Sequence, residues 1–209
     1  MLELTHNDIK KAVIRSQHCQ RNFDLNRQIP QEDIDLIIHA ATNCPAKQNI
    51  SFYNLYVITD RSVVEALHTN SVGAKAFNTD LGESEYVTNS QINANLVLAF
   101  QPIEWASMSE HYRTHEYIDE ELYRRDQNVA IGIAAGYVNL TASMMGYQTG
   151  CCNCFDQDAA MEILGLDTDV DLLMGIGFKS EGKNRRVHSQ NDKLIFPTFK
   201  KETIKVIYK

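Results

Sequence analysis

The sequence contains neither a long apolar run nor an excess of positive charge. Its 209 residues include no stretch of about 18 consecutive apolar residues, so no membrane-spanning helix is expected. The N-terminus lacks the basic, apolar and small-residue regions of a secretory signal peptide. The net charge of −7 argues against nucleic acid or an anionic membrane as a general partner, although a small anionic ligand needs only a local basic cluster.

Motifs of several common enzyme classes are also absent. No G-x-x-x-x-G-K-[ST] phosphate loop and no G-x-S-x-G nucleophile elbow occurs. The five cysteines are an odd number, and without an export signal they indicate free thiols in a reducing cytoplasm. The chain length and a hydrophobic content of 44% are enough for one well-buried core, so we expect a single domain over residues 1–209.

The residue pattern is typical of helices and strands that alternate along the chain. The predicted helices run from a Thr5–Asp8 capping box to about Gln17, from Ile34 to near Asn43, from Gln127 to Tyr147, and from Asp156 to Gly165. The predicted strands are Phe52–Thr59, Asn95–Phe100 and Leu172–Phe178. Residues 71–90, which are rich in Gly, Asn, Ser and Thr, are predicted to form a loop. Because apolar and small residues surround the third helix, we expect it to be buried on most sides, within a layered α/β or α+β architecture.

The chain ends with a pattern typical of an edge strand. Ile204, Val206 and Tyr208 alternate with polar residues. An edge strand with no later strand in its own chain needs a neighbour, so this pattern indicates a homodimer.

Three cysteines lie within four residues, Cys151-Cys152-Asn153-Cys154, in a predicted loop. The Cys151-x-x-Cys154 spacing is compatible with zinc ligands, but a structural zinc site needs two more, for example from Cys19 or Cys44. It is also compatible with a redox pair, if the following helix lowers the pKa of the first thiol. Small apolar side chains that line a loop are the third interpretation, and the residues alone leave all three open.

Four segments of the chain are similar in order and spacing to the motifs of one enzyme family. They are His18-Cys19-Gln20-Arg21-Asn22-Phe23-Asp24, Ala40-Ala41-Thr42-Asn43-Cys44-Pro45-Ala46-Lys47-Gln48-Asn49, the helix end Gly146-Tyr147 with the cysteine loop to Asp156, and Gly175-Ile176-Gly177-Phe178 with the later Arg185-Arg186. From about Ile14 to Arg186 the chain resembles the FMN-dependent nitroreductase family.

The resemblance implies a fold and a cofactor. The fold is a central, mostly antiparallel sheet flanked by helices, with the C-terminal strand exchanged between the subunits of a homodimer. The cofactor is FMN, with no metal. The residues at matching cofactor positions are Gln17, His18, Cys19, Arg21, Pro45, Ala46, Lys47, Gln48, Asn49, Asn89, Cys152, Asn153, Cys154, Arg185 and Arg186.

The resemblance also implies roles for some of these residues. Arg21, Arg185 and Arg186 match positions that supply cations to the FMN phosphate, and the residue that Arg21 matches also lies near the flavin N1 and O2. The segment 45–49 matches one that reaches the flavin of the partner subunit, and the backbone of residues 153 and 154 matches the donor to flavin N5. Gln17 and Cys19 replace the usual Arg and Ser, unless the preceding Arg15-Ser16 fills those roles in a shifted register. A solvated arginine pair and a simple turn at Asn49 are the alternative interpretations.

The implied function is that of an NAD(P)H-dependent oxidoreductase. Hydride would pass from NAD(P)H through flavin N5 to an electron-poor small molecule, such as a nitro compound or a quinone, in a ping-pong reaction. The stretch from Trp105 to Tyr123, with Tyr112, Arg113 and Tyr117, is the expected substrate-selecting lid; a surface helix pair is the alternative. The other hypotheses are a flavin-binding protein without turnover and a cysteine-loop metal or dithiol module.

Overall fold

A central antiparallel sheet organises the chain in a computed structural model that describes residues 5–115 and 119–209. Its strands lie in the order β1 (Tyr53–Ile58), β4 (Leu96–Pro102), β6 (Leu172–Gly177) and β5 (Gln148–Cys152), and each neighbouring pair is antiparallel. Strand β4 is an apolar run buried on both faces, as the centre of a two-sided sheet requires. The predictions of a mostly antiparallel sheet and of three of its strands are confirmed.

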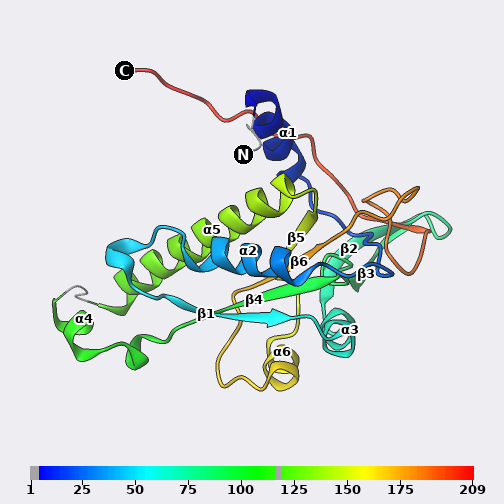
Figure 1. The fold of residues 1–209 in the computed structure, drawn as a ribbon. Coiled ribbons are helices and arrows are strands. Elements are labelled where there is room, and N and C mark those ends of the chain that lie inside the picture. Colours follow the sequence, from blue (N-terminus) through cyan, green and yellow to red (C-terminus); the bar gives the residue numbers. More distant parts are fainter. Residues whose placement is uncertain (1–4, 116–118) are drawn as a thin grey trace.

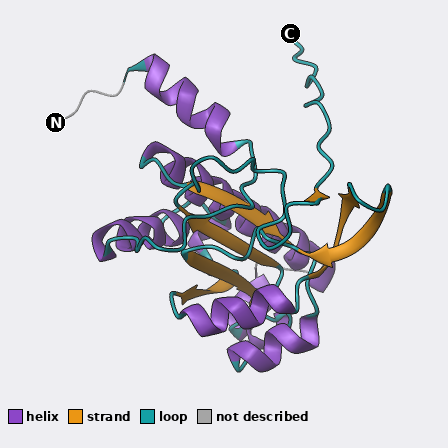
Figure 2. Cartoon of the chain, turned by 90° about the vertical axis from the view of Figure 1, so that its right-hand side faces the viewer, coloured by secondary structure: helices purple, strands orange, loops and turns teal. Residues whose placement is uncertain are grey.

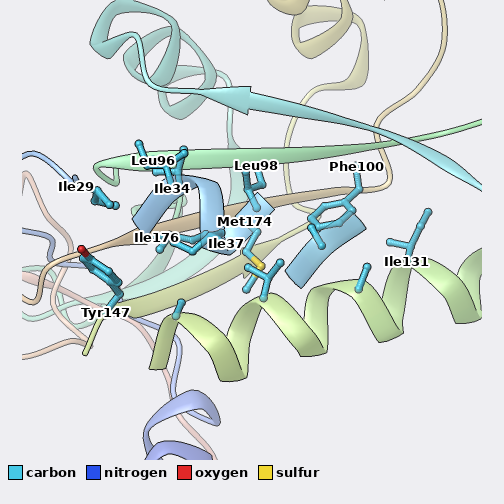
Figure 3. Packing of buried hydrophobic residues seen from close by; sticks show 14 residues of the cluster. Ile29, Ile34, Ile37, Leu96, Leu98, Phe100, Ile131, Tyr147, Met174 and Ile176 are labelled. Carbon is cyan, nitrogen blue, oxygen red and sulfur yellow. The ribbon is translucent and has the colours of Figure 1, made fainter. Parts of the chain in front are cut away.

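Helices cover both faces of this sheet (Figures 1 and 2). On one face, α2 (Gln31–Thr42) and α5 (Glu120–Met144) pack against β4 and β6 through a core that includes Ile37, Leu98 and Met174, each fully buried (Figure 3). On the other face, α3 (Arg61–Thr69) and α6 (Gln157–Leu164) pack on the same strands. Burial of these aliphatic side chains stabilises the fold by about 1.5–3 kcal/mol each.

A second, smaller sheet corrects the prediction that residues 71–90 form a loop. Strands β2 (Val72–Asn78) and β3 (Glu83–Thr88) form a hairpin, and β7 (Leu194–Ile195) pairs with β2. The hairpin pairs through its backbone and buries only small side chains such as Ala76, so its composition resembles that of a loop. Gly82, at φ 72°, occupies the left-handed position of the connecting turn.

The terminal helix α1 (His6–Ser16) begins at the predicted capping box of Thr5 and Asp8. Among its residues only Ala12 is buried, whereas Ile9, Val13 and Ile14 are exposed. Helix α5 begins at Glu120, earlier than predicted, because its first turns are charged and carry no apolar pattern. The expectation that α5 is buried on most sides is wrong within a single subunit, since Val129 and Tyr137 are about half exposed there.

The cysteine segment is a strand and not a loop up to Cys152. Cys151 and Cys152 end β5, and the turn that follows leads to α6, which has the predicted cap at Asp156 and the predicted left-handed stop at Gly165. Thr149 is the one β-branched residue of β5, so the strand propensity of this segment is low and its sequence does not predict a strand.

The remaining described segments are short or irregular. They are η1 (Lys47–Asn49), η2 (Trp105–Ser107) and α4 (Glu110–His115). The tail from 197 to 209 forms no strand within the chain, and Figure 2 shows it extending away from the body, as α1 does. The predicted strand exchange therefore stays a prediction. No helix among the described residues is long and apolar enough to cross a membrane.

Candidate functional site

The segment that carries Arg21 lies between β5 and the loop that follows β6. The Gln20 N–H donates to the carbonyl of Thr149 at 2.8 Å, which adds this segment to the free edge of β5. On its other side, Asn22 Nδ2 donates to the carbonyl of Asn184 at 2.8 Å. Two stretches of chain that are far apart in sequence therefore fix the position of Arg21.

Two glycines allow the backbone segments around Arg21 to approach the sheet closely. A Cβ at Gly150 would lie 2.8 Å from the Gln20 carbonyl oxygen and 2.8 Å from Gln91 Cβ. A Cβ at Gly175, on the neighbouring strand, would lie 2.0 Å from the Gln91 carbonyl oxygen. Both positions require the absence of a side chain, because the backbone comes so close.

A basic pocket opens beside this segment, with a volume of about 280 Å³. Its lining residues are Arg15, His18, Gln20, Gln148, Lys179, Lys183, Asn184 and Arg185. Four of them carry a permanent positive charge, and none of this lining, taken from the described part of the chain, is acidic. Such a pocket attracts a phosphate or another small anion in an otherwise acidic protein.

The pocket brings together some of the predicted cofactor residues and leaves out others. His18 and Arg185 line it, and Arg185 Nη1 also lies 3.5 Å from the carbonyl oxygen of Cys19. Arg186 instead donates through Nε to the Phe196 carbonyl at 3.2 Å, and Gln17 is an exposed residue at the end of α1.

Three lining cations were absent from the predicted site residues: Arg15, Lys179 and Lys183. For Arg15 the signal was the shifted register of the opening motif. For Lys183 it was the basic run from 183 to 186, of which only the second half was used. Nothing in the sequence pattern marks Lys179.

Arg21 is held in a buried, electropositive environment. Its Cζ atom lies 4.6 Å from the centre of the Phe196 ring, a cation–π contact, and its Nε has no hydrogen-bond partner in the described part of the chain. Burial lowers the pKa of Arg21, and the charges of Arg185 and Arg186 lower it further, against the opposing effect of Cys19 and Cys152. An unpaired buried guanidinium N–H is costly, and an anionic or polar acceptor would offset that cost.

Burial disfavours the thiolate form of two cysteines near Arg21. Burial, with a smaller contribution from Cys19, raises the pKa of Cys151 to about 12, and burial raises that of Cys152 to about 11. The redox hypothesis needed a lowered pKa at the first thiol, and the burial of Cys151 acts in the opposite direction. Among residues 5–115 and 119–209, no three His, Cys, Asp or Glu side chains are arranged to hold a metal ion.

Asn89 is buried next to the cysteines. Its Nδ2 donates to Cys152 Sγ and to Gln91 Oε1, both at 2.9 Å. The Cys154 N–H also donates to Cys152 Sγ, at 3.3 Å. Of the two main-chain donors expected here, Cys154 is therefore already engaged inside the protein, which leaves Asn153 as the simpler donor to a ligand.

The segment 45–49 lies far from the basic pocket within one chain. Lys47 Nζ pairs with Asp126 Oδ2 at 2.9 Å, whereas the pocket residue Arg15 donates to the carbonyl of Ser143 at 2.9 Å. Asp126 and Ser143 both lie on α5, roughly 25 Å apart at about 1.5 Å per residue. One small ligand therefore cannot touch both segments of the same chain.

The same segment has an unusual backbone. Gln48 and Asn49 have φ angles of 51° and 57°, which are left-handed conformations at consecutive residues that are not glycine. Asn adopts this conformation more readily than most residues, but Gln does so rarely. Asn49 and Ala46 line a separate cavity of about 360 Å³ at the end of α2, so the strained turn borders a hollow surface.

The predicted substrate residues lie near this second end of the molecule. Tyr112 and Arg113 belong to α4, which Figure 1 shows at the opposite end from the β2–β3 hairpin. Arg113 Nε is buried without a hydrogen-bond partner in the described part of the chain. Tyr117 lies outside the described residues.

Comparison with family models identifies one family. The chain matches the model of the Nitroreductase family over residues 14–178, whereas no curated protein matches it. A protein from Bacillus subtilis assigned as a nitroreductase has a structure with a TM-score of 0.71 and 16% identity, covering 98% of this chain and 100% of its own.

Two further solved structures share the fold. One, from Staphylococcus epidermidis, is assigned as an NAD(P)H:FMN oxidoreductase, with a TM-score of 0.63, 21% identity, and coverage of 90% of this chain and 95% of its own. The other, from Exiguobacterium sibiricum, is assigned as a nitroreductase in complex with FMN, with a TM-score of 0.62, 16% identity, and coverage of 90% and 94%. The predicted fold, apart from the exchange of the C-terminal strand, is confirmed, and the chain belongs to the nitroreductase family.

Proposed function

We propose that this protein is an FMN-dependent NAD(P)H oxidoreductase of the nitroreductase type, active as a homodimer. The observation that carries the proposal is the carboxylate-free basic pocket beside the buried, unpaired Nε of Arg21. Membership of the nitroreductase family and the FMN complex of the Exiguobacterium relative support the same cofactor.

The residues present fit FMN. The pocket cations Arg15, Lys183 and Arg185 suit a phosphate group, because guanidinium and ammonium groups form charge-assisted hydrogen bonds with its oxygens. Their spread over α1 and the loop after β6 would enclose the phosphate from two sides. His18 adds a further donor.

Arg21 suits the polar edge of a flavin ring. A fixed cation at this edge would favour reduction, because the reduced ring accumulates negative charge there. The contact with the Phe196 ring holds the guanidinium in place before any ligand binds. The hydrogen bond from Asn22 Nδ2 to the Asn184 carbonyl fixes the neighbouring backbone. The backbone N–H of Asn153 would supply the donor near N5, while Cys154 contributes to the same rim.

When bound, FMN would supply hydride and electron transfer between NAD(P)H and an electron-poor small molecule, such as a nitro compound or a quinone. The protein's own contribution would be binding, orientation and electrostatics. No side-chain acid or base is assigned an essential role.

A second copy of the chain would complete the site. Apolar side chains remain exposed on α1, on α5 and in the tail, among them Val13, Tyr137 and Tyr208, which is 93% exposed. Such an extended apolar surface is typical of a subunit interface. The separation of the 45–49 segment from the basic pocket supports a contribution from the partner. Tyr112 and Arg113 would then lie on the substrate side of the same shared site.

One experiment separates this proposal from its alternatives. The purified protein is examined for flavin absorbance and metal content, and NADH or NADPH is then added without air. We expect a yellow protein that bleaches with one of the two donors. A yellow protein that does not bleach would favour a flavin-binding protein without turnover, and a colourless, zinc-loaded protein would favour the cysteine-loop module.

A further inference from the structure

The side chain of Cys152 lies against the backbone of Cys154. The Sγ atom of Cys152 lies 3.3 Å from the backbone nitrogen of Cys154 and 3.6 Å from its carbonyl oxygen, so the inner side chain is folded over the outer residue. Residues 153 and 154 lie outside regular secondary structure, which allows the backbone to adopt the Cα separation of a disulfide.

The other cysteines are directed elsewhere. Cys151 packs against the core between the sheet and α5, on the opposite face from Cys152. Cys44 donates to the Ala41 carbonyl at the far end of α2. Cys151, the first residue of the conventional C-x-x-C pair, therefore lies on the opposite face of the sheet from Cys152.

The two thiols also differ in access to solvent. Cys154 is exposed, whereas Cys152 is only 3% exposed. An outer thiol that meets the oxidant and an inner thiol that resolves the product are the two parts of a reversible redox pair.

We propose that Cys152 and Cys154 form a reversible dithiol–disulfide pair at the rim of the cofactor site, oxidised by a hydroperoxide. The Cys154 thiolate attacks the distal peroxide oxygen, the O–O bond breaks, and a sulfenic acid and an alcohol or water result once the leaving oxygen is protonated. The Cys152 sulfur then attacks the Cys154 sulfur, the S–OH bond breaks, and water leaves with the Cys152 proton. Two electrons pass from the two thiols to the peroxide, and external dithiol reverses the change.

The oxidation state of this pair would control a main-chain donor. In the reduced protein, Cys152 Sγ accepts from the Cys154 N–H and from Asn89 Nδ2. A disulfide sulfur carries less negative charge and is a weaker acceptor, so closure would free the Cys154 N–H. Because the proposed function places the Asn153 N–H near flavin N5, with Cys154 at the same rim, this part of the inference rests on that function.

Disulfide mapping tests the pair. The reduced holoprotein is treated with hydrogen peroxide, free thiols are alkylated, and peptides are analysed by mass spectrometry. We expect wild type and Cys151→Ser to lose two hydrogens and two alkylation sites within the 151–154 peptide. Cys154→Ser should lose neither, whereas Cys152→Ser should form no disulfide and should lose alkylation only at Cys154, which stays oxidised without its resolving partner. Cys44→Ser is the distant control and should behave as wild type. Since Cys154 is exposed, its variant should fold even if Cys152→Ser does not.

Two results would overturn the pair: closure that persists in Cys154→Ser, or a disulfide that links Cys19 to Cys151 or joins two chains. FMN titration of the oxidised and reduced proteins tests the coupling. We expect about three- to tenfold tighter binding after oxidation, the effect of one additional N–H donor. Equal affinities would contradict the coupling, whereas absence of FMN binding in both forms would refute the proposed function and leave the mapping result valid.

Discussion

Arg21 and Phe196 form a cation–π contact of 4.6 Å although almost the whole chain separates them in sequence. Phe196 is 2% exposed and stacks in turn on His188, with ring centres 5.8 Å apart. The loop after β6 therefore returns to cover the opening segment of the chain. This contact, rather than a hydrogen bond, orients the guanidinium that we assign to the flavin ring.

Replacement of Arg21 by Ala should weaken FMN binding by about tenfold or more, because a charge-assisted hydrogen bond in a buried site contributes about 1.5–3 kcal/mol. It should also lower the reduction potential of the bound flavin, since the cation that favours the reduced ring is removed. Fluorescence titration and a spectroscopic redox titration measure the two effects.

The control for this change is Arg27→Ala. Arg27 lies 3.5 Å over the Phe178 ring, so it makes the same kind of contact outside the basic pocket. Loss of the Arg27 side chain should leave both the affinity for FMN and the reduction potential of the bound flavin unchanged. Equal effects of the two substitutions would show that Arg21 acts only through general stability.

Replacement of Arg185 by Ala should affect FMN and riboflavin differently. Riboflavin lacks the phosphate, so its affinity should stay constant while that of FMN falls by about tenfold or more. Arg186→Ala should have the smaller effect, because the Arg186 side chain already donates to the Phe196 carbonyl. If both flavins weaken in parallel, Arg185 does not contact the phosphate.

Acid should destabilise the protein through His68. This residue is 2% exposed, its Nε2 has no partner among the described residues, and its ring centre lies 6.2 Å from that of His188. Burial, with smaller contributions from the nearby His188 and Arg61, lowers the pKa of His68 to about 4.

The sign follows from the lowered pKa. Above pH 6.5 His68 is neutral in both the folded and the unfolded chain, so it adds no pH dependence to the free energy of unfolding. Between about pH 6.5 and 4 the unfolded chain binds the proton more readily, so the free energy of unfolding falls as pH falls, by on the order of 2 kcal/mol. Urea unfolding of His68→Leu should show a shallower decrease over this range; the exposed His39→Gln is the control. Parallel curves for wild type and His68→Leu would contradict the assignment.

Introduction of a charge on the exposed face of α5 should produce monomers. Tyr137→Asp places a carboxylate in the surface that we assign to the subunit interface, where Tyr137 is 46% exposed in one chain. Sedimentation should detect the monomer, and FMN binding should weaken because the partner's 45–49 segment is lost. Leu81→Asp, on the hairpin turn, introduces the same charge at an exposed apolar residue and should leave the dimer intact. A dimeric Tyr137→Asp protein would place the interface elsewhere.

The sequence predicted those elements whose signals are local. The cap at Asp156, the stop at Gly165 and the apolar strand β4 each carry their own signal and were placed within a few residues. The hairpin of β2 and β3 was not predicted. Its stability comes from backbone pairing and from packing of Leu194 against it, and neither contact produces a local sequence pattern.

The candidate site was predicted in part for the same reason. Arg21 and Arg185 were found through motif spacing. The contributions of Arg15 and Lys179 depend on how α1 and the loop after β6 meet in space, so they appeared only in the structure. The meaning of the cysteines also changed, because strand alternation directs Cys151 and Cys152 to opposite faces of the sheet.

The most direct test of the account is a titration of the flavin-free protein with FMN and with riboflavin. The account predicts one FMN per chain, bound at least about tenfold more tightly than riboflavin, with that preference reduced by inorganic phosphate. No binding, or equal affinity for the two flavins, would contradict the assignment of the basic pocket and Arg21 to FMN.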